Sequence, residues 1–491
     1  MSFLKHPGCI YINGEWQPTA ASEPVINPAD ESLLIEAPVG SAAQVDAAIA
    51  AARHAFDHTD WPRLPVARRQ ALMTRFLDAI DARKAEIVDM IVAEAGATRV
   101  LADFLQYGIP MKHARRTVEV ASRPAITPLP IELTPNAAGM TTLGTGVISR
   151  EPVGVVAAIS PYNFPFFLNI GKVVPALVVG CTVVLKPSPY TPIEALILGE
   201  IADEVGLPKG VLNIVTGDVE AGKLLTTDSR VDLVHFTGSD KVGEMIQAQG
   251  APTLKRIVME LGGKSALIVR ADANIQEAAA AALGGFTVHC GQGCALTTRH
   301  LVHNSVRPQF VATLQAMLGH MKIGNPADPT VNYGPLIREV ARERTERYVQ
   351  IAQDEGATLV AGGKRPAGLD KGFFFEPTLF DNVRNDSRLA QEEVFGPIGA
   401  VIGFDDDDEA IALANASDFG LSGAICSADA GKAFEMALQI RTGGVSINGG
   451  GGTMLSDAPF GGIKRSGYGR EYGEDGLNEF TYQKVITFSA K

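Results

Sequence analysis

The sequence predicts an α/β protein with two lobes, a cleft between them, and extended arms that belong to neither lobe. Three observations predict it: short β-branched runs alternate with helical segments from Val153, a second alternation follows Glu260, and two extended segments lie outside both. Such alternation favours parallel sheets covered on both faces. Ligands commonly bind between two such lobes.

Two helical regions precede the first alternation. Small and apolar residues recur at helical spacing from Ser41 to His58, and a second helical region runs from Val66 to about Glu94. We expect helices that pack on a core in both places.

The strands are predicted from the β-branched runs themselves. In the first lobe these are Val153–Ile159, Thr182–Leu185, Val211–Val215 and Val231–Phe236. In the second lobe the candidates are Ser265–Val269, Arg299–Val302, Thr358–Ala361 and Ala400–Phe404. The extended segments, from about Ile131 to Arg150 and from Glu479 to Ser489, are predicted to be arms that pair with the sheet edge of another subunit.

Composition argues against several classes of protein. The 491 residues carry a net charge of −12 without a basic stripe, so we expect no nucleic-acid partner. The longest apolar run, Val173 to Leu185, is shorter than the roughly 20 residues of a membrane span, and a buried helix followed by a buried strand explains it. Met1 to Gly8 has no apolar core followed by small residues, so we expect no secretory signal. The five scattered cysteines are typical of a reducing compartment, so we expect a cytoplasmic protein with no membrane partner.

The acidic run from Asp405 to Glu409 has two interpretations. Clustered carboxylates suit a metal ion, but acids directly before an apolar helical stretch also favour the positive end of the helix dipole. The second interpretation explains the run, so we predict no metal.

Covalent thiol chemistry is indicated by Cys294, in the segment Cys290–Cys294, and by Glu260, in the segment Met259–Ser265. A thiolate nucleophile needs a partner that later activates water. A carboxylate held in a glycine turn can do so without occupying the space of the nucleophile.

A phosphate-binding turn is indicated by Phe236–Gly243, which follows a predicted strand and opens a helix. Its backbone amides can hold a pyrophosphate at the helix N-terminus. The segments Ile159–Pro165 and Lys186–Pro192 follow two other strands, and ligands of open α/β sheets bind at those carboxyl ends.

Over nearly its whole length the chain resembles the aldehyde dehydrogenase superfamily. The matching motifs come in the order and spacing of that family. They are the Asn163 segment, Lys186, Gly238–Gly243, the Glu260 segment, Gly291–Cys294, Glu392–Pro397 and Pro459–Gly467.

The resemblance implies a mechanism that the residue types also support. Cys294 would attack an aldehyde carbon as a thiolate, while the Asn163 amide and the Cys294 backbone N–H hold the oxyanion. Hydride would pass to a nicotinamide, and Glu260 would activate the water that releases a free acid. Lys172 occupies the position of a lysine that relays protons from the base.

The resemblance also implies a site for NAD or NADP. Lys186 would bond the adenosine ribose, Ser239 the pyrophosphate and Glu393 the nicotinamide ribose, with Phe395 packed at the nicotinamide end. The other residues expected around the cofactor are Ile159, Ser160, Tyr162, Ser188, Pro189, Gly238, Gly243 and Leu261.

Pro189 departs from the family pattern in the cofactor region. Strictly NAD-using members often carry a glutamate here, three residues after Lys186, and its charge would repel a 2′-phosphate. The departure predicts use of both cofactors, or a preference for NADP.

Further departures surround the nucleophile. Thr287 replaces a bulky apolar residue, His289 replaces a common asparagine, and Gly293 and Leu296 are unusual. His289 has three interpretations: it contacts substrate, lowers the pKa of the thiol, or is a satisfied pocket histidine.

Gly171 replaces the tryptophan or arginine of many members. We expect it to open space lined by Phe164, Leu168 and Met111, which favours a bulky aromatic or long apolar aldehyde. The predicted substrate pocket consists of Phe164, Leu168, Gly171, His289, Gly293 and Phe460.

The sequence leaves two alternative functions open. A cofactor-independent thiol esterase or hydrolase would use Cys294 and Glu260 alone, and a catalytically idle structural member would use neither. An acyl-CoA-forming member is disfavoured by Glu260. Cys181 and Cys426 are interpreted as buried and inert, and Cys290 either lines the pocket or forms a regulatory disulfide.

The domain prediction follows the family. Residues 1–130 and 151–259 would form a cofactor-binding domain, 260–459 a catalytic domain, and 131–150 with 460–491 the oligomerisation arm and bridging segments. We expect a homodimer or homotetramer that acts on a small-molecule aldehyde.

Overall fold

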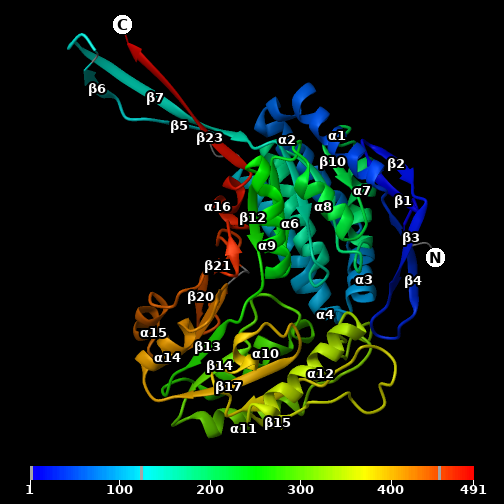
Figure 1. Ribbon diagram of the computed structural model, residues 1–491, viewed down its shortest axis with the longest axis vertical. Coiled ribbons are helices and arrows are strands. Elements are labelled where there is room, and N and C mark those ends of the chain that lie inside the picture. The colour runs from blue at the N-terminus through cyan, green and yellow to red at the C-terminus, as the bar shows by residue number, and fades with distance from the viewer. Residues whose placement is uncertain (1–3, 122–124, 136, 452–454, 491) are drawn as a thin grey trace.

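The chain folds into two α/β lobes and a projecting arm in the structure, a computed structural model (Figure 1). The structure describes residues 4–121, 125–135, 137–451 and 455–490. Residues 1–3 of the segment searched for a signal, residue 136 of the predicted arm and residues 452–454 of the predicted catalytic domain lie outside the described residues. The predicted fold class is confirmed.

The larger sheet collects strands from distant parts of the chain. Its order is β2 (Glu15–Pro18), β1 (Cys9–Ile12), β10 (Leu212–Ile214), β9 (Thr182–Lys186), β8 (Val155–Ile159), β11 (Leu233–Thr237), β12 (Arg256–Glu260) and β22 (Gly467–Tyr468). Strands β9, β8, β11 and β12 are parallel neighbours, so their last residues meet at one edge. These last residues are Lys186, Ile159, Thr237 and Glu260. Ile159 is in register with Lys186 and with Phe236, and Thr237 is in register with Glu260.

Helices of the first lobe pack on this sheet and on one another. They are α1 (Ala42–His58), α2 (Val66–Ala82), α3 (Lys84–Ala95), α4 (Arg99–Leu101), α5 (Ile109–Val120), α6 (Pro165–Val179), α7 (Ile193–Glu204), α8 (Val219–Thr227) and α9 (Asp240–Gly250). Ser41 caps α1 in a capping box with Gln44. The predicted helical region from Val66 to about Glu94 is confirmed, and it consists of α2 and α3, which are separated where Arg83 (φ −107°, ψ 17°) leaves the helical conformation.

The apolar run from Val173 to Leu185 forms the second half of α6 and most of β9, both buried, as predicted. None of the helices in the described ranges has the length and apolar character that crossing a membrane requires. A π-helical turn, Ala102–Gly108, connects α4 to α5.

The second sheet forms the other lobe, drawn at the bottom of Figure 1. Its order is β15 (Thr358–Ala361), β16 (Thr378–Asp381), β17 (Ile398–Phe404), β14 (Arg299–His303), β13 (Ala266–Val269), β19 (Ser422–Cys426) and β20 (Gly444–Ile447). Its helices are α10 (Ile275–Thr287), α11 (Arg307–Leu318), α12 (Glu339–Asp354), α13 (Arg388–Gln391), α14 (Asp407–Asn415) and α15 (Ala430–Ala437). The acidic run supplies the first turn of α14, Asp407 to Glu409, and Asp406 caps the helix by accepting from the Glu409 N–H at 2.8 Å, so the helix N-terminus interpretation is confirmed.

The arm consists of β5 (Ile126–Pro128), β6 (Glu132–Pro135), β7 (Thr141–Pro152) and β23 (Thr481–Ala490). Figure 1 shows it projecting away from both lobes. β7 and β23 pair antiparallel along their whole length, so the two predicted arms form one sheet with each other.

Short elements complete the fold. They are the hairpin β3 (Ala21–Ile26) and β4 (Leu33–Val39), the pair β18 (Phe419–Gly420) and β21 (Ile463–Lys464), helix α16 (Gly473–Asn478), and 3₁₀ turns at Trp61–Arg63, Ala251–Thr253 and Val288–Gly291. Through β21 and β22 the segment after residue 460 contacts both lobes.

Candidate active site

The 3₁₀ turn before Cys294 has an unusual backbone. His289, Cys290 and Gly291 are consecutive residues with φ of 49°, 55° and 74°. Two of them are not glycine, and such backbone strain concentrates at functional sites. A side chain at Gly291 would collide with the backbone of Gly396 and Pro397, so the turn packs directly against that segment.

Gln292 fixes the turn. Its backbone N–H and its Nε2 both donate to the His289 carbonyl, at 3.1 and 3.0 Å, and its Oε1 accepts from the Ile337 N–H at 3.0 Å. Its own carbonyl accepts from Asn163 Nδ2 at 2.8 Å. The strained turn therefore sets the position of the Asn163 amide, which retains a second N–H for a ligand.

Glu260 ends β12 and is fully buried. Among the described residues neither of its carboxylate oxygens has a hydrogen-bond partner. Burial, and next the charge of Glu471, raise the pKa of Glu260 well above its usual range, although Lys172 and Arg470 act in the opposite direction.

Lys172 makes a buried ion pair on α6. Its Nζ lies 2.5 Å from Glu471 Oε1 and donates to Thr237 Oγ1 at 2.7 Å, and both charged side chains are inaccessible to solvent. Glu471 was missed in the sequence, where no pattern distinguishes it from other acids near the C-terminus. A neighbouring imidazole, His235, is kept neutral because burial, and then Lys172, hold its pKa well below the ordinary value.

Cys294 is partly buried in the loop after the turn. Burial is the largest cause that raises the pKa of its thiol to about 12, and Glu393, Glu260 and Glu471 add to it. His289 does not oppose this effect, since burial lowers its pKa to about 4 and leaves it uncharged. The interpretation of His289 as a group that lowers the thiol pKa is therefore wrong.

The predicted phosphate turn lies where expected. β11 ends at Thr237, and Ser239 caps α9 through a 3.4 Å hydrogen bond from the Val242 N–H to Ser239 Oγ. Gly243, in the first turn of this helix, packs against the side chain of Leu261, which follows β12.

The other predicted cofactor residues differ in burial and in their hydrogen-bond partners. Lys186 is buried, its pKa is lowered to about 8 by burial, and its Nζ donates to the Pro187 carbonyl at 3.1 Å. Ser160 bonds Asn169 at 2.5 Å, and Ser188 accepts from the Tyr190 N–H at 3.2 Å, so both hydroxyls have internal partners. Pro189 lies next to them and is partly exposed, whereas Ile159 belongs to the core.

Glu393 and Phe395 reach the same region from the second lobe. Glu393 Oε1 accepts from the Gly263 N–H at 3.0 Å, and burial raises the pKa of this carboxyl to about 7. Phe395 has φ of 52°, and its ring meets that of Tyr162 edge-on at 6.1 Å.

An apolar cluster adjoins the turn on the side of Asn163. It consists of Leu105, Ile109, Phe164, Phe167, Leu168, Phe460 and Tyr472. Phe164 also meets the His289 ring at 5.5 Å, and Gly293 packs on Leu296. The structure thus brings Phe164, Leu168 and Phe460 together, and it adds members that the sequence did not single out.

The prediction that Gly171 opens space is wrong. A Cβ at Gly171 would lie 2.9 Å from the hydroxyl oxygen of Tyr472, whose ring occupies the room left by the missing side chain. Met111 belongs to the large core of the first lobe rather than to this cluster.

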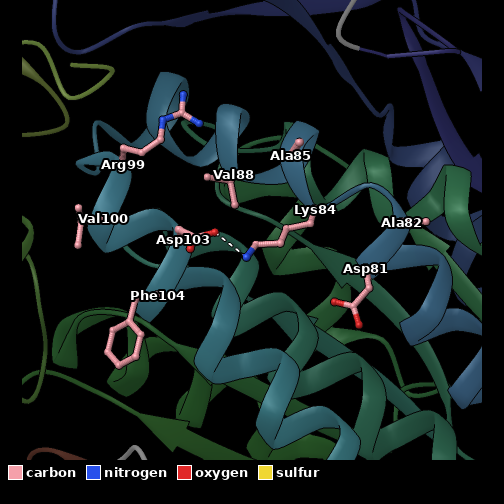
Figure 2. Close-up of a pocket in the computed structure, with 9 residues that line it drawn as sticks. All are labelled: Asp81, Ala82, Lys84, Ala85, Val88, Arg99, Val100, Asp103 and Phe104. Atoms are coloured by element: carbon pink, nitrogen blue, oxygen red, sulfur yellow. Dashed lines mark ion pairs between the residues drawn. The ribbon is translucent and has the colours of Figure 1, made fainter. Parts of the chain in front are cut away.

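Cys290 is buried, and its Sγ lies 3.1 Å from the Tyr333 hydroxyl. The cysteines of the described residues, Cys290 included, are free thiols. Cys290 and His289 line a cavity of about 420 Å³ between the turn and the segment from Thr98 to Leu105. A larger surface hollow of about 700 Å³ lies on the outer side of that segment, around the Lys84–Asp103 ion pair (Figure 2), and contains none of the predicted site residues.

Comparison with known proteins decides the family. The profile of the aldehyde dehydrogenase family matches residues 16–486. The chain belongs to the aldehyde dehydrogenase family. It is 35% identical to betaine aldehyde dehydrogenase of Staphylococcus aureus in complex with NAD+, with a TM-score of 0.94, covering 99% of this chain and 96% of that one.

Two other solved structures are similar over comparable lengths. An aldehyde dehydrogenase of Mycobacterium tuberculosis complexed with NAD+ is 38% identical, with a TM-score of 0.91 and 98% of each chain covered. A cysteine-to-alanine mutant of aldehyde dehydrogenase C from Pseudomonas syringae, complexed with NAD+ and octanal, is 34% identical, with a TM-score of 0.92, covering 98% of this chain and 96% of that one. The predicted membership and oxidoreductase class are confirmed.

The raised thiol pKa predicts how Cys294 reacts in the free protein. Because the thiolate is the reactive form, its iodoacetamide alkylation rate should rise about tenfold per pH unit from about pH 7 to 10, without a plateau. Glu260→Gln removes one negative charge that raises this pKa, so it should speed alkylation at a given pH. Site-resolved mass spectrometry measures both rates, and a plateau below about pH 8 would contradict the raised pKa.

Because the ion pair is buried, loss of one partner should destabilise the fold far more than loss of both partners. Lys172→Met leaves Glu471 buried and unpaired, which should lower the free energy of unfolding by about 3–5 kcal/mol. The double variant Lys172→Met/Glu471→Met should recover most of this loss. Denaturant unfolding measures the free energy of each variant. The control is Lys209→Met, which removes an exposed pair with Glu15 and should cost under about 1 kcal/mol. Equal losses of stability at the two sites would contradict a special role for the buried pair.

Proposed function

We propose that the chain oxidises an aldehyde to the carboxylic acid through a thioester on Cys294, with NAD as the hydride acceptor. One observation carries the proposal, namely that two groups adjoin Cys294. The Asn163 amide donates to the carbonyl of Gln292, two residues before Cys294, and the charge of Glu260 raises the pKa of the Cys294 thiol. Nucleophile, oxyanion donor and base therefore surround one point.

Cys294 forms the bond to carbon. Its thiol loses a proton to solvent, and the sulfur forms a bond to the aldehyde carbon while the C=O π bond breaks, so that the aldehyde oxygen becomes an oxyanion. The second N–H of Asn163 and the backbone N–H of Cys294 stabilise that oxyanion. Accepting the hydride is the chemistry that a bound nicotinamide supplies, and loss of the hydride leaves a thioester on Cys294.

Glu260 is the base for hydrolysis. A carboxylate whose pKa is raised by burial is a stronger base than an exposed one, so it can take a proton from the attacking water. The tetrahedral intermediate collapses and expels the Cys294 thiolate, which releases the acid. Lys172 acts as a positioning residue, since its ammonium holds Glu471 beside Glu260.

The residues around the phosphate turn fit a dinucleotide. Among the described residues Lys186 Nζ has one hydrogen-bond acceptor for its three N–H donors, and the N-terminus of α9 favours an anion. Lys186 would hold the adenosine ribose, Ser239 the pyrophosphate and Glu393 the other ribose.

NAD and NADP would both be accepted, with NAD preferred. Pro189 presents no carboxylate to a 2′-phosphate, but the charges of Asp218 and then Glu23 act on Lys186 and disfavour a further anion there. All three similar structures described above contain NAD+, which supports the preference for NAD.

The substrate proposed from the apolar cluster is a bulky aromatic or long apolar aldehyde. Phe164, Phe167 and Phe460 supply aromatic surface, which suits an apolar substrate body. The octanal bound to the Pseudomonas syringae relative is an aldehyde of the long apolar kind.

The mechanism predicts distinct defects in two variants. Cys294→Ala should lose about 10⁴-fold in rate, because the nucleophile is gone. Glu260→Gln should form one equivalent of NADH in a burst and then stall, with the acyl group retained on Cys294. Stopped-flow absorbance and intact mass spectrometry measure these, and Cys426→Ser, at a buried thiol outside the site, is the control expected to keep full activity.

Three outcomes would redirect the functional proposal. Ester hydrolysis without nicotinamide, lost in Cys294→Ala, would favour a thiol hydrolase. A requirement for coenzyme A would favour acyl transfer. No turnover in the wild type with any aldehyde or cofactor would favour an idle member.

The arm is proposed to pair with a second copy of the chain, which gives a homodimer or homotetramer. Its strands expose apolar side chains that a monomer leaves in water. These include Ile126, Leu133, Val485, Ile486 and Phe488, each about half exposed or more. The domain ranges proposed from the sequence are kept, except that β5 (Ile126–Pro128) pairs with β7 and so belongs to the arm.

The arm proposal predicts a change of mass in solution. Val485→Glu should shift sedimentation velocity towards the monomer, because it places a charge in an apolar contact. Phe434→Glu, at an equally exposed apolar site on α15, is the control expected to leave the mass unchanged. A monomeric wild type would contradict the proposal.

A further inference from the structure

Tyr472 carries a polar group that the fold does not satisfy. The residue is 8% exposed, and among the described residues its hydroxyl has no hydrogen-bond partner. A buried hydroxyl without a partner is costly, so such a group calls for an explanation.

The position of the hydroxyl is fixed by its surroundings. Adjacent residues on two segments face each other: Lys172 pairs with Glu471, and Gly171 contacts Tyr472. The Tyr472 ring packs edge-on against Phe167 at 5.6 Å, and its backbone has φ of 62°, a conformation unusual for a tyrosine. The absence of a side chain at Gly171 is what admits the hydroxyl.

The hydroxyl lies near the reacting groups. Burial is the largest cause that raises the pKa of Tyr472 well above its ordinary value, and Glu471, Glu260 and Cys294 follow. The phenol therefore stays protonated and remains a hydrogen-bond donor. It also belongs to the apolar cluster proposed to receive the body of the substrate.

We propose that the Tyr472 hydroxyl donates a hydrogen bond to an oxygen substituent of the substrate, so that the preferred substrates are aromatic aldehydes bearing a ring hydroxyl or alkoxy group. This inference rests on the proposed aldehyde oxidation. A site that holds a hydrogen-bonding group in an apolar pocket discriminates strongly against the analogue that lacks the partner.

Matched substrates test the inference. The 2-, 3- and 4-hydroxybenzaldehydes are compared with the methylbenzaldehydes of the same positions, because methyl and hydroxyl groups are similar in size. Acid product is quantified by chromatography, since hydroxybenzaldehydes absorb near the NADH band. For at least one position the wild type should prefer hydroxyl over methyl by about 10- to 100-fold in kcat/KM.

Two variants assign that preference to Tyr472. Tyr472→Phe removes one oxygen and should abolish the preference by lowering kcat/KM for the hydroxy compound alone. Gly171→Ala should do the same, since its Cβ would displace the hydroxyl. Because both changes act on one contact, kcat/KM for the hydroxy compound should fall no further in the double variant than in Tyr472→Phe alone. Tyr468→Phe, at an exposed tyrosine, is the control expected to leave the preference unchanged.

The outcomes separate this inference from the proposed function. A wild type that does not distinguish the pairs, or a Tyr472→Phe variant that slows both members equally, would overturn the inference while leaving aldehyde oxidation intact. Failure of the wild type to oxidise any aldehyde would instead overturn the proposed function. Thermal melts of each variant show whether a loss of activity reflects unfolding.

Discussion

The buried ion pair between Lys172 and Glu471 is the contact on which the geometry of the site depends. It ties α6 to the segment after β22, and Thr237 at the end of β11 completes it. Removing two charges from water costs several kcal/mol for each ion, so the pair is tolerated only with close geometry and an added hydrogen bond. Because Gly171 and Tyr472 are the sequence neighbours of the two ions, the pair also positions the contact between them.

The turn before Cys294 supplies the second constraint. Left-handed backbone at His289 and Cys290 is unfavourable, and it persists because Gln292 and the packed glycine of the turn hold it. The same Gln292 presents its carbonyl to Asn163. The strain is therefore coupled to the placement of the amide donor beside the nucleophile.

Burial favours the protonated forms of the two carboxyl groups and of the thiol in the site. Burial raises the pKa of Glu260, Glu393 and the Cys294 thiol together, and the two carboxylates add to the effect on the thiol. A thiol of this kind reacts only when a base accepts its proton. The proposed role of Glu260 is separate from this requirement, since Glu260 acts on the hydrolytic water. The buried and uncharged His289 supplies no positive charge that would favour the thiolate.

The sequence by itself determined the α/β class, the central strands, the acidic N-terminus of α14, the turn into α9 and the family motifs, because periodicity, capping and turn chemistry act over a few residues. The tertiary structure alone decided the break at Arg83, the partner of Lys172 and the fate of the space beside Gly171. Lys172 and Glu471 are 299 positions apart, and the Gly171–Tyr472 contact spans a similar separation. No local pattern links such residues, since their contact arises only when the C-terminal segment packs across α6.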